Sequence, residues 1–314
     1  MKAILHYSAT PGLRTAIDTS APSWLDVEVI EVDDAETFTH SMATCDVLLH
    51  VLEPVTAEMI ANAPQLQLIQ KIGVGVNTID LDAATTANIA VANMPGTNSR
   101  AVAELTIGLM LATLRSIPRL DTAARAGTAW PPDPQVVDAF GEIGGRTVGL
   151  IGFGEIPRRI TPVLSAMGAN VIYTATSPKQ DTATRFVALD ELLAQSDIVS
   201  LHCPLTDETK NMIDATRIAT MKPGAILINT ARGALVDEQA LADALRSGVL
   251  SGAGLDVFAV EPAPPDQDLF KLDNVIITPH IAWLTAETLT RSMTVAFDNC
   301  LRLRDGNTLQ HQII

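Results

Sequence analysis

Short apolar segments alternate with segments of helical spacing along the whole chain, and this alternation strongly limits its fold. The apolar segments are rich in Val, Ile and Leu, which is typical of parallel strands that are covered on both faces of a sheet. The predicted strands are Lys2–His6, Val27–Val32, Asp46–Val51, Leu66–Lys71, Ile89–Asn93, Thr147–Gly152, Asn170–Thr174, Asp197–His202, Ala225–Thr230, Gly252–Val257 and Val275–Thr278. The predicted helices between them include Ala57–Ala61, Leu81–Thr86, Glu238–Arg246 and Ala286–Arg302. The pattern predicts an α/β protein with doubly wound parallel sheets.

The length of the chain predicts more than one domain. Its 314 residues exceed the ~100–200 residues of an ordinary domain, and the pattern divides near residue 98. The segment Asn98–Arg125 then carries one long apolar pattern. A helix that bridges two lobes and a buried core helix both fit this pattern equally well.

Charge and cysteine content limit the partners and the compartment. The formal net charge is −15, which repels nucleic acid and anionic lipid, so we expect neither as a partner. Cys45, Cys203 and Cys300 are far apart, which predicts no disulfide framework or metal site and favours a reducing compartment. We find no signal-peptide pattern and no apolar run near the ~20 residues that span a bilayer. We therefore expect a cytoplasmic protein.

A glycine-containing turn follows the predicted strand at 147–152. Gly152 allows a tight turn, Gly154 allows close approach to a pyrophosphate, and the next helix offers free N–H groups. The pattern predicts a dinucleotide site at Gly152, Phe153, Gly154, Glu155 and Ile156. Pro157 stands at the third glycine position; proline suits the first turn of a helix, but local packing between helix and strand should differ.

The next strand lacks the acidic residue that usually binds the adenosine ribose. Thr174 stands at the expected place. The hydroxyls of Thr176 and Ser177, with the cations Lys179 or Arg158, are suited to hold a 2′-phosphate instead. The sequence therefore favours NADP over NAD, although a site that tolerates Thr174 and still binds NAD fits as well.

Four ionisable residues follow or end strands in the second half of the chain: Arg232, Asp256, Glu261 and His280. In open α/β sheets the carboxyl ends of strands line the ligand crevice. Each residue alone has an ordinary structural explanation, but together, beside a dinucleotide, they indicate hydride transfer at a carbonyl. His280 is suited to donate the proton, Glu261 to orient the imidazole and favour its charged form, and Arg232 to hold a 2-oxo acid.

Several motifs in the same order resemble the D-isomer-specific 2-hydroxyacid dehydrogenase family, over nearly the whole chain. Besides the glycine turn they are Ile72–Asn77, Val91–Gly96, Ala103–Glu104, Leu201–Thr206, Asn229–Gly233, Asp256–Pro262 and Pro279–Ala282. The resemblance implies a flavodoxin-like substrate-binding domain, residues 1–98 plus 286–314, and a Rossmann NAD(P)-binding domain, residues 99–285. It also implies a homodimer.

The resemblance further implies roles for individual residues. Arg232, Glu261 and His280 would be catalytic, and Arg232 and His280 would bind substrate with the backbone N–H groups of the loop at 74–76. That loop consists of Val74, Gly75 and Val76. The cofactor site would also include Cys203, Pro204, Thr209, Thr230, Ala231, Asp256 and His280.

The expected activity is reduction of a small 2-oxo acid by NADPH or NADH. Trp283 resembles a tryptophan of family members that reduce glyoxylate and hydroxypyruvate, so we expect it to shape the pocket or reach across a dimer interface. Two alternatives stay open. One is a 3-phosphoglycerate dehydrogenase, and the other is a nucleotide-sensing binding protein similar to the corepressors of this superfamily.

Overall fold

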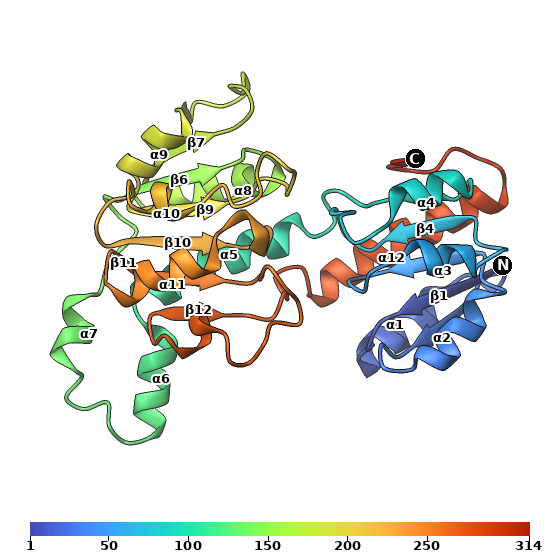
Figure 1. The fold of residues 1–314 in the computed structure, drawn as a ribbon, viewed down its shortest axis with the longest axis horizontal. Coiled ribbons are helices and arrows are strands. Elements are labelled where there is room, and N and C mark those ends of the chain that lie inside the picture. The colour runs from blue at the N-terminus through green and yellow to red at the C-terminus, as the bar shows by residue number, and fades with distance from the viewer. The chain divides into compact units, whose positions relative to one another are not determined.

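The computed structural model covers residues 1–314 and describes all of them except the side chain of Gln135. The chain divides into two compact units (Figure 1). Unit 1 comprises Met1–Asn98 and Leu284–Ile314, and unit 2 comprises Ser99–Trp283. The chain returns to unit 1 after Trp283, slightly earlier than the predicted boundary at residue 285.

Unit 1 is built on a parallel five-stranded sheet in the order β2-β1-β3-β4-β5. This is the flavodoxin-like order, as predicted. The strands are β1 (Lys2–His6), β2 (Asp26–Ile30), β3 (Val47–His50), β4 (Leu68–Lys71) and β5 (Ala90–Ala92). The helices are α1 (Pro11–Ser20), α2 (Ala35–Met42), α3 (Ala57–Ala61), α4 (Leu81–Thr86) and α12 (Ala286–Arg304).

Both faces of this sheet are covered, which explains why its strands read as continuous apolar runs. On one face, Ile4, Leu48 and Ile69 pack in one core with side chains from α2, α3 and α4. Helices α1 and α12 contact each other, and α12 contacts β4. The C-terminal segment therefore completes the unit in which the chain begins.

Unit 2 contains a parallel seven-stranded sheet in the order β12-β11-β10-β9-β6-β7-β8. Its strands are β6 (Thr147–Ile151), β7 (Asn170–Thr174), β8 (Arg185–Phe186), β9 (Ile198–Leu201), β10 (Ala225–Asn229), β11 (Leu250–Leu255) and β12 (Val275–Ile277). The strand order reverses between β6 and β9. In such sheets, ligands bind beyond the carboxyl ends of the strands at this reversal.

Helices cover both faces of the second sheet. They are α5 (Ser99–Leu114), α6 (Ile117–Arg125), α7 (Pro134–Asp138), α8 (Glu155–Ala166), α9 (Leu189–Gln195), α10 (Ala215–Ile218) and α11 (Glu238–Arg246), with 3₁₀ turns at Gly233–Leu235 and Asp268–Lys271. Side chains of α5 and α8 share one core cluster, and those of α9, α10 and α11 share another. The two parallel sheets with their helices confirm the predicted α/β fold class.

The apolar segment 98–125 forms two helices and not one. Helix α5 ends at Leu114, and α6 begins at Ile117 after Ser116, whose φ is +50°. Pro118 explains the break, because its ring would clash with the carbonyl of residue 114 in a continuous helix. Leu109, Met110 and Leu114 of α5 lie in the core of unit 2, which favours the core-helix interpretation.

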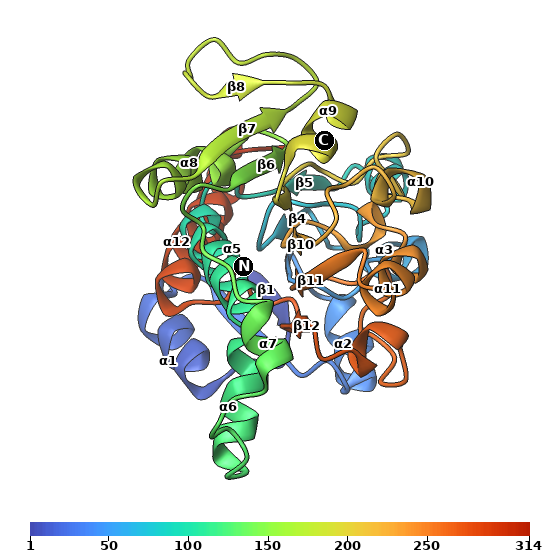
Figure 2. The same cartoon turned by 90° about the vertical axis from the view of Figure 1, so that its left-hand side faces the viewer.

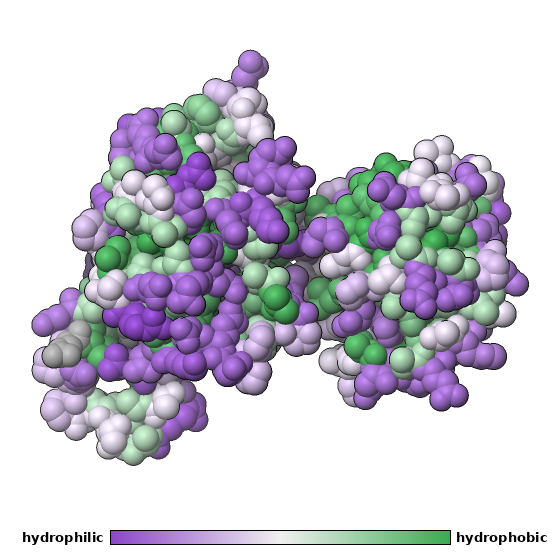
Figure 3. All heavy atoms as spheres, in the orientation of Figure 1, coloured by the Kyte–Doolittle hydropathy of each residue, from purple (hydrophilic) through white to green (hydrophobic). Residues whose placement is uncertain are grey.

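Helix α6 extends away from the sheet of unit 2 in both ribbon views (Figure 2), and α7 does so in Figure 1. Figure 3 shows hydrophilic and apolar residues mixed on the viewed side of this extension. No single helix in the described part of the chain is long and apolar enough to cross a membrane; only α5 and α6 taken together, bent by 64°, have the length and composition.

Candidate active site

The glycine turn lies where the strand order of unit 2 reverses. Gly152 directly follows β6 and has a φ of +97°, and a Cβ there would lie 2.7 Å from the carbonyl oxygen of His202, just after β9. Gly152 N–H donates to the carbonyl of Thr174 (2.8 Å). The turn therefore needs glycine for both its backbone angle and its close contact with the neighbouring strand.

The next amides are suited to an anion. Within the described residues, the N–H groups of Phe153, Gly154, Glu155 and Ile156 make no hydrogen bond, as expected where α8 begins. A Cβ on Gly154 would meet nothing within 4 Å, so its surroundings leave room for a ligand. Pro157 is the third helical residue, where an N–H has no intrahelical acceptor, so proline removes no hydrogen bond there.

The end of β7 bears a different arrangement from a simple ribose-binding acid. Thr174 is half-buried at the strand end, and Thr176 and Ser177 are exposed. Arg158 Nη2 donates to Asp181 Oδ1 (2.8 Å), and the guanidinium lies 5.3 Å from the centre of the Phe153 ring. The carboxylate of Asp181, which lies outside the predicted site residues, is therefore fixed beside the start of α8.

Tyr173 ties the following loop to the sheet. Its ring centre lies 4.1 Å from that of Phe153, and its hydroxyl accepts a hydrogen bond from Lys179 N–H (2.7 Å). This bond holds the backbone of Lys179 near the end of β7.

The other predicted cofactor residues follow β9 and β10. Cys203 Sγ contacts Met212 Sδ at 3.6 Å, and burial raises the pKa of its thiol to about 11, which fits a wall residue and not a nucleophile. The Thr209 hydroxyl donates to the carbonyl of Pro204 (2.8 Å). The Thr230 and Thr106 hydroxyls lie 2.9 Å apart, and Ala231 N–H donates to the side chain of Asn229.

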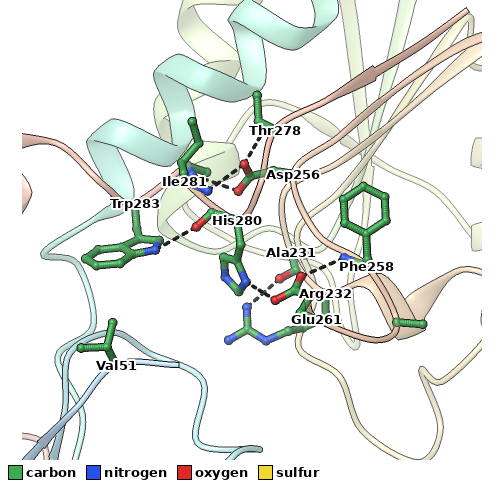
Figure 4. Close-up of polar contacts among 12 residues, drawn as sticks. Val51, Ala231, Arg232, Asp256, Phe258, Glu261, Thr278, His280, Ile281 and Trp283 are labelled. Carbon is green, nitrogen blue, oxygen red and sulfur yellow. Dashed lines mark hydrogen bonds and ion pairs between the residues drawn. The ribbon is translucent and has the colours of Figure 1, made fainter. Parts of the chain in front are cut away.

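His280 and Glu261 form the central pair of the site (Figure 4). His280 Nδ1 lies 2.6 Å from Glu261 Oε2, and Glu261 Oε1 accepts from Phe258 N–H at 2.9 Å. A carboxylate only accepts hydrogen bonds, so Nδ1 carries the proton and Nε2 is left to face a substrate. Burial alone would raise the pKa of Glu261, but the hydrogen bond and charge of His280, with Arg232 nearby, lower it.

Gly233 lets the loop with Glu261 approach the end of β10. A Cβ on Gly233 would lie 1.9 Å from the carbonyl carbon of Phe258, so no other residue fits without moving the backbone. Glu238 anchors the same loop, because its Oε1 accepts from Ala259 N–H (2.7 Å). These two contacts place Glu261 near Arg232.

Arg232 is half-buried, and Nη1 donates to the carbonyl of Ala231 (2.6 Å). Burial lowers the pKa of its guanidinium, while the charge of Glu261 acts in the opposite direction. An arginine stays charged in proteins even so. The guanidinium therefore offers a partly desolvated cation beside the His280–Glu261 pair.

Asp256 supports the turn that carries His280. Its carboxylate accepts from the Thr278 hydroxyl (2.5 Å) and from the N–H groups of Ile281 and Ala282 (both 2.9 Å). Burial raises the pKa of Asp256, although these hydrogen bonds act against the rise. The structure thus shows a local use for an aspartate that was predicted to lie near the nicotinamide.

The predicted substrate-binding loop belongs to unit 1 and follows β4. Carbonyls of this loop are hydrogen-bonded by the two residues that follow β5. Gly73 O accepts from Met94 N–H (2.9 Å), and Val74 O accepts from Asn93 Nδ2 (2.9 Å). Within the described residues, the N–H groups of Val74, Gly75 and Val76 make no hydrogen bond. Consecutive unpaired amides of this kind can bind an anion.

No group of three or more His, Cys, Asp or Glu side chains suited to a metal is found among the described residues. Unit 2 brings together a glycine turn at the strand reversal, a paired imidazole and carboxylate, and a half-buried guanidinium. Residues 107–282 match the family described as D-isomer specific 2-hydroxyacid dehydrogenase, NAD binding domain. The chain belongs to this family. The predicted family resemblance is confirmed, and unit 2 contains the matched NAD-binding domain.

Curated relatives with different names are similar to this chain. A glyoxylate reductase of Thermofilum pendens is 40% identical over 291 residues, covering 90% of this chain and 86% of the relative. A hydroxypyruvate reductase of Thermotoga maritima is 42% identical over 241 residues, covering 76% and 77%. A D-3-phosphoglycerate dehydrogenase of Mycobacterium leprae is 40% identical over 290 residues, covering 90% of this chain. This chain spans 54% of the length of that last relative.

A solved structure has the same fold over its full length. The TT0316 protein of Thermus thermophilus aligns with a TM-score of 0.90 and 35% identity, covering 100% of both chains.

Proposed function

We propose that this protein is an NAD(P)H-dependent reductase of small 2-oxo acids such as glyoxylate or hydroxypyruvate. The observation that carries the proposal is the 2.6 Å contact between His280 Nδ1 and Glu261 Oε2, beside Arg232 and in the same unit as the glycine turn. The half-buried imidazole has the half-buried guanidinium of Arg232 close to its carboxylate partner, an arrangement suited to binding an anionic substrate beside a proton donor. Relatives named glyoxylate reductase and hydroxypyruvate reductase support the same substrate class.

The cofactor fits the residues present. The unpaired amides of Phe153, Gly154, Glu155 and Ile156 would hold the pyrophosphate, and the room around Gly154 admits it. When bound, the reduced nicotinamide supplies the hydride that adds to the substrate carbonyl carbon.

The side chains of unit 2 would manage the charge that develops on the carbonyl oxygen. His280 Nε2 donates a proton to this oxygen, and the imidazole that results keeps its Nδ1 proton on Glu261. In the reverse direction, Glu261 stabilises the imidazolium that forms. Arg232 binds the carboxylate of the substrate and its carbonyl oxygen through a planar pair of N–H donors.

Unit 1 is proposed to be the substrate-binding domain, residues 1–98 plus the C-terminal segment. The unpaired N–H groups of Val74, Gly75 and Val76 form an anion-binding loop. A substrate carboxylate is the anion that the family relationship suggests.

The first test is to follow loss of reduced-nicotinamide absorbance with purified protein and a panel of 2-oxo acids. The panel contains glyoxylate, hydroxypyruvate and phosphohydroxypyruvate, with NADH and NADPH in parallel. Fast turnover of either unphosphorylated acid supports the proposal. Preference for phosphohydroxypyruvate would favour the second candidate function, a phosphoglycerate dehydrogenase. The 40% identity to the Mycobacterium leprae enzyme is the reason for testing this candidate. Cofactor binding without turnover of any acid would instead point to a nucleotide-sensing protein.

The role of His280 is tested by His280→Gln. We expect kcat to fall by at least ~100-fold, since a general acid contributes a factor of ~10²–10⁴, with cofactor affinity nearly unchanged. His40→Gln, an exposed histidine of unit 1, is the control. Full activity in His280→Gln would remove His280 from the mechanism.

We also propose that NADPH is preferred over NADH. β7 itself ends without a carboxylate, and the carboxylate nearby, Asp181, is paired with Arg158, which also lies by the Phe153 ring at the edge of this site. Arg158→Gln should lower the ratio of kcat/KM for NADPH to that for NADH by ~10-fold or more, because a charge-assisted hydrogen bond contributes ~1.5–3 kcal/mol. Arg159→Gln on the same helix is the matched control. An unchanged ratio in Arg158→Gln would contradict the assignment of this arginine.

The homodimer is a proposal that the extension of unit 2 supports. None of the described side chains of α6 is buried, and the side chain of Trp130, in the loop that follows, is 79% exposed. Light scattering should give a mass near twice 33.4 kDa, and Trp130→Glu should weaken the dimer. A monomer at micromolar concentration would overturn this proposal.

A further inference from the structure

His280 has an unusual backbone conformation. Its φ is +53°, in the left-handed region, which residues other than glycine rarely adopt. A left-handed residue persists only where surrounding contacts impose it. The direction of the imidazole therefore depends on whatever holds this backbone.

The backbone of His280 is hydrogen-bonded at both of its polar groups. Its N–H donates to the carbonyl of Asp256 (2.7 Å), and its own carbonyl accepts from the indole Nε1–H of Trp283 (3.0 Å). Figure 4 shows the indole turned toward this carbonyl, on the side of the turn away from Asp256. Asp256 fixes the amides that follow, and the indole of Trp283 holds the carbonyl.

We infer that Trp283 is a positioning residue for the acid–base pair, acting through this indole hydrogen bond. The inference rests on the proposed function for its consequence in catalysis. Trp283 lies three residues after His280, so the bond closes a short loop around the turn and opposes rotation of the 280–281 peptide. Without it, this peptide loses one of the contacts that keep His280 left-handed, and the imidazole samples directions in which the bond to Glu261 is lengthened.

The position of the indole separates this role from the two roles that the sequence suggested. A residue that only shapes a pocket needs its ring, and a residue that reaches a partner subunit must point outward. Here the indole nitrogen is used within the same turn, and Trp283 is only 8% exposed. The N–H, and not only the ring, is predicted to matter.

The kinetic test compares Trp283→Phe with Trp24→Phe, which removes an indole from unit 1 that packs on Arg304. For Trp283→Phe we expect kcat to fall by ~3- to 10-fold, the range for loss of one neutral hydrogen bond. KM for the 2-oxo acid and Kd for the cofactor should stay within ~2-fold, because neither carboxylate nor nucleotide binding uses this bond. Trp24→Phe should leave all three constants unchanged.

A second readout does not need turnover. Proton NMR of protein with ¹⁵N-labelled histidine should show a downfield, slowly exchanging signal for the Nδ1 proton held on Glu261, identified by its loss in His280→Gln. In Trp283→Phe this proton should exchange with solvent at least several-fold faster. Because the signal is read without substrate, it tests the inference even if no 2-oxo acid is reduced.

An isosteric replacement separates the N–H from the ring and guards against a variant that fails to fold. Benzothienylalanine introduced at position 283 keeps the shape of tryptophan but has sulfur in place of N–H. It should reproduce the faster exchange and the lower kcat, while tryptophan incorporated by the same route restores both. Unchanged exchange with this residue would overturn the inference. A rise in KM with constant kcat would also overturn it and make Trp283 a pocket wall.

Discussion

Acid should destabilise unit 1 through one buried histidine, His50. Its side chain is 3% exposed, and its Nε2 lies 2.7 Å from the carbonyl of Glu53. Burial lowers its pKa to about 3, and the nearby charge of Lys71 adds to the effect. His50 is therefore neutral in the folded protein across the whole range in which a free histidine becomes protonated.

The sign follows from which state binds more protons. In the unfolded chain a histidine has a pKa of ~6.5, so below this pH the unfolded state takes up a proton that the folded state refuses. The free energy of unfolding therefore falls as the pH falls from 6.5 toward 3. The loss is ~1.4 kcal/mol per pH unit, or ~3 kcal/mol at pH 4.5, relative to the value above pH 7.

The test is urea unfolding of the wild type and of His50→Gln between pH 7 and pH 4. Glutamine can still donate to the Glu53 carbonyl but does not titrate. Fluorescence of Trp24 reports on unit 1, because this indole packs 4.3 Å from the guanidinium of Arg304 in α12; the other two tryptophans are replaced by Phe. The slope of unfolding free energy against pH should be smaller in His50→Gln by ~1.4 kcal/mol per unit below pH 6.

His40→Gln provides the control, since His40 is exposed on α2 and its replacement should leave the slope as in the wild type. Other groups contribute equally to both proteins, so only the difference in slope is interpreted. Equal slopes for His50→Gln and the wild type would refute the argument that a neutral, buried His50 limits acid stability.

Three further predictions concern unit 2 and the cysteines. Gly152→Ala should destabilise the protein by ~1–3 kcal/mol in thermal melts, because of the positive φ and the 2.7 Å approach to His202. Gly154→Ala should melt at the wild-type temperature but bind NADH and NADPH more weakly. Equal melting temperatures of the two variants would contradict this prediction. Glu261→Gln should lower kcat/KM by ~10-fold or more with the fold retained, since a neutral amide cannot stabilise an imidazolium; unchanged kcat/KM would exclude a role for the charge. Burial raises the pKa of the three thiols to about 11 or 12. They should therefore react with a disulfide reagent at pH 8 far more slowly in the native protein than in urea. Equal reaction rates in the two conditions would refute this prediction.

The sequence predicted most of the fold because both sheets are buried on both faces. Strands such as β3 and β9 are fully buried, and a continuous apolar run is then a reliable signal. The two-residue strand β8, Arg185–Phe186, was missed since both residues are exposed. The break at Ser116 was also missed, although Pro118 was a local signal for it.

The candidate site was predicted largely from the rule that strand ends meet at one edge of a sheet. Arg232, Glu261 and His280 each follow a strand or its loop, and the structure brings them together in unit 2 (Figure 4). Their chemical roles stay a prediction for the experiments above. Position along a strand indicates which residues share an edge, but not how each side chain is held.

Contacts made across the fold could not be predicted from one sequence. Asp181 lies seven residues after Thr174, outside the place where a ribose-binding acid is expected, and only folding of the loop brings it to Arg158. The bond from Trp283 to the carbonyl of His280 depends on a left-handed backbone. No sequence pattern predicts a left-handed backbone conformation at a histidine.

The geometry of Asp256 limits what this residue can do for the cofactor. A carboxylate has about four lone-pair sites for hydrogen bonds, and three donors already occupy this one. The Thr278 hydroxyl and the Ile281 N–H bind Oδ1, and the Ala282 N–H binds Oδ2. About one site therefore remains, on Oδ2. Asp256 can accept at most a single further hydrogen bond, so an interaction with the nicotinamide would be secondary to its role in holding the turn of His280. Asp256→Asn would replace one acceptor oxygen with an NH₂ donor that faces other donors. We expect this change to disrupt the turn of His280 more than it weakens cofactor binding.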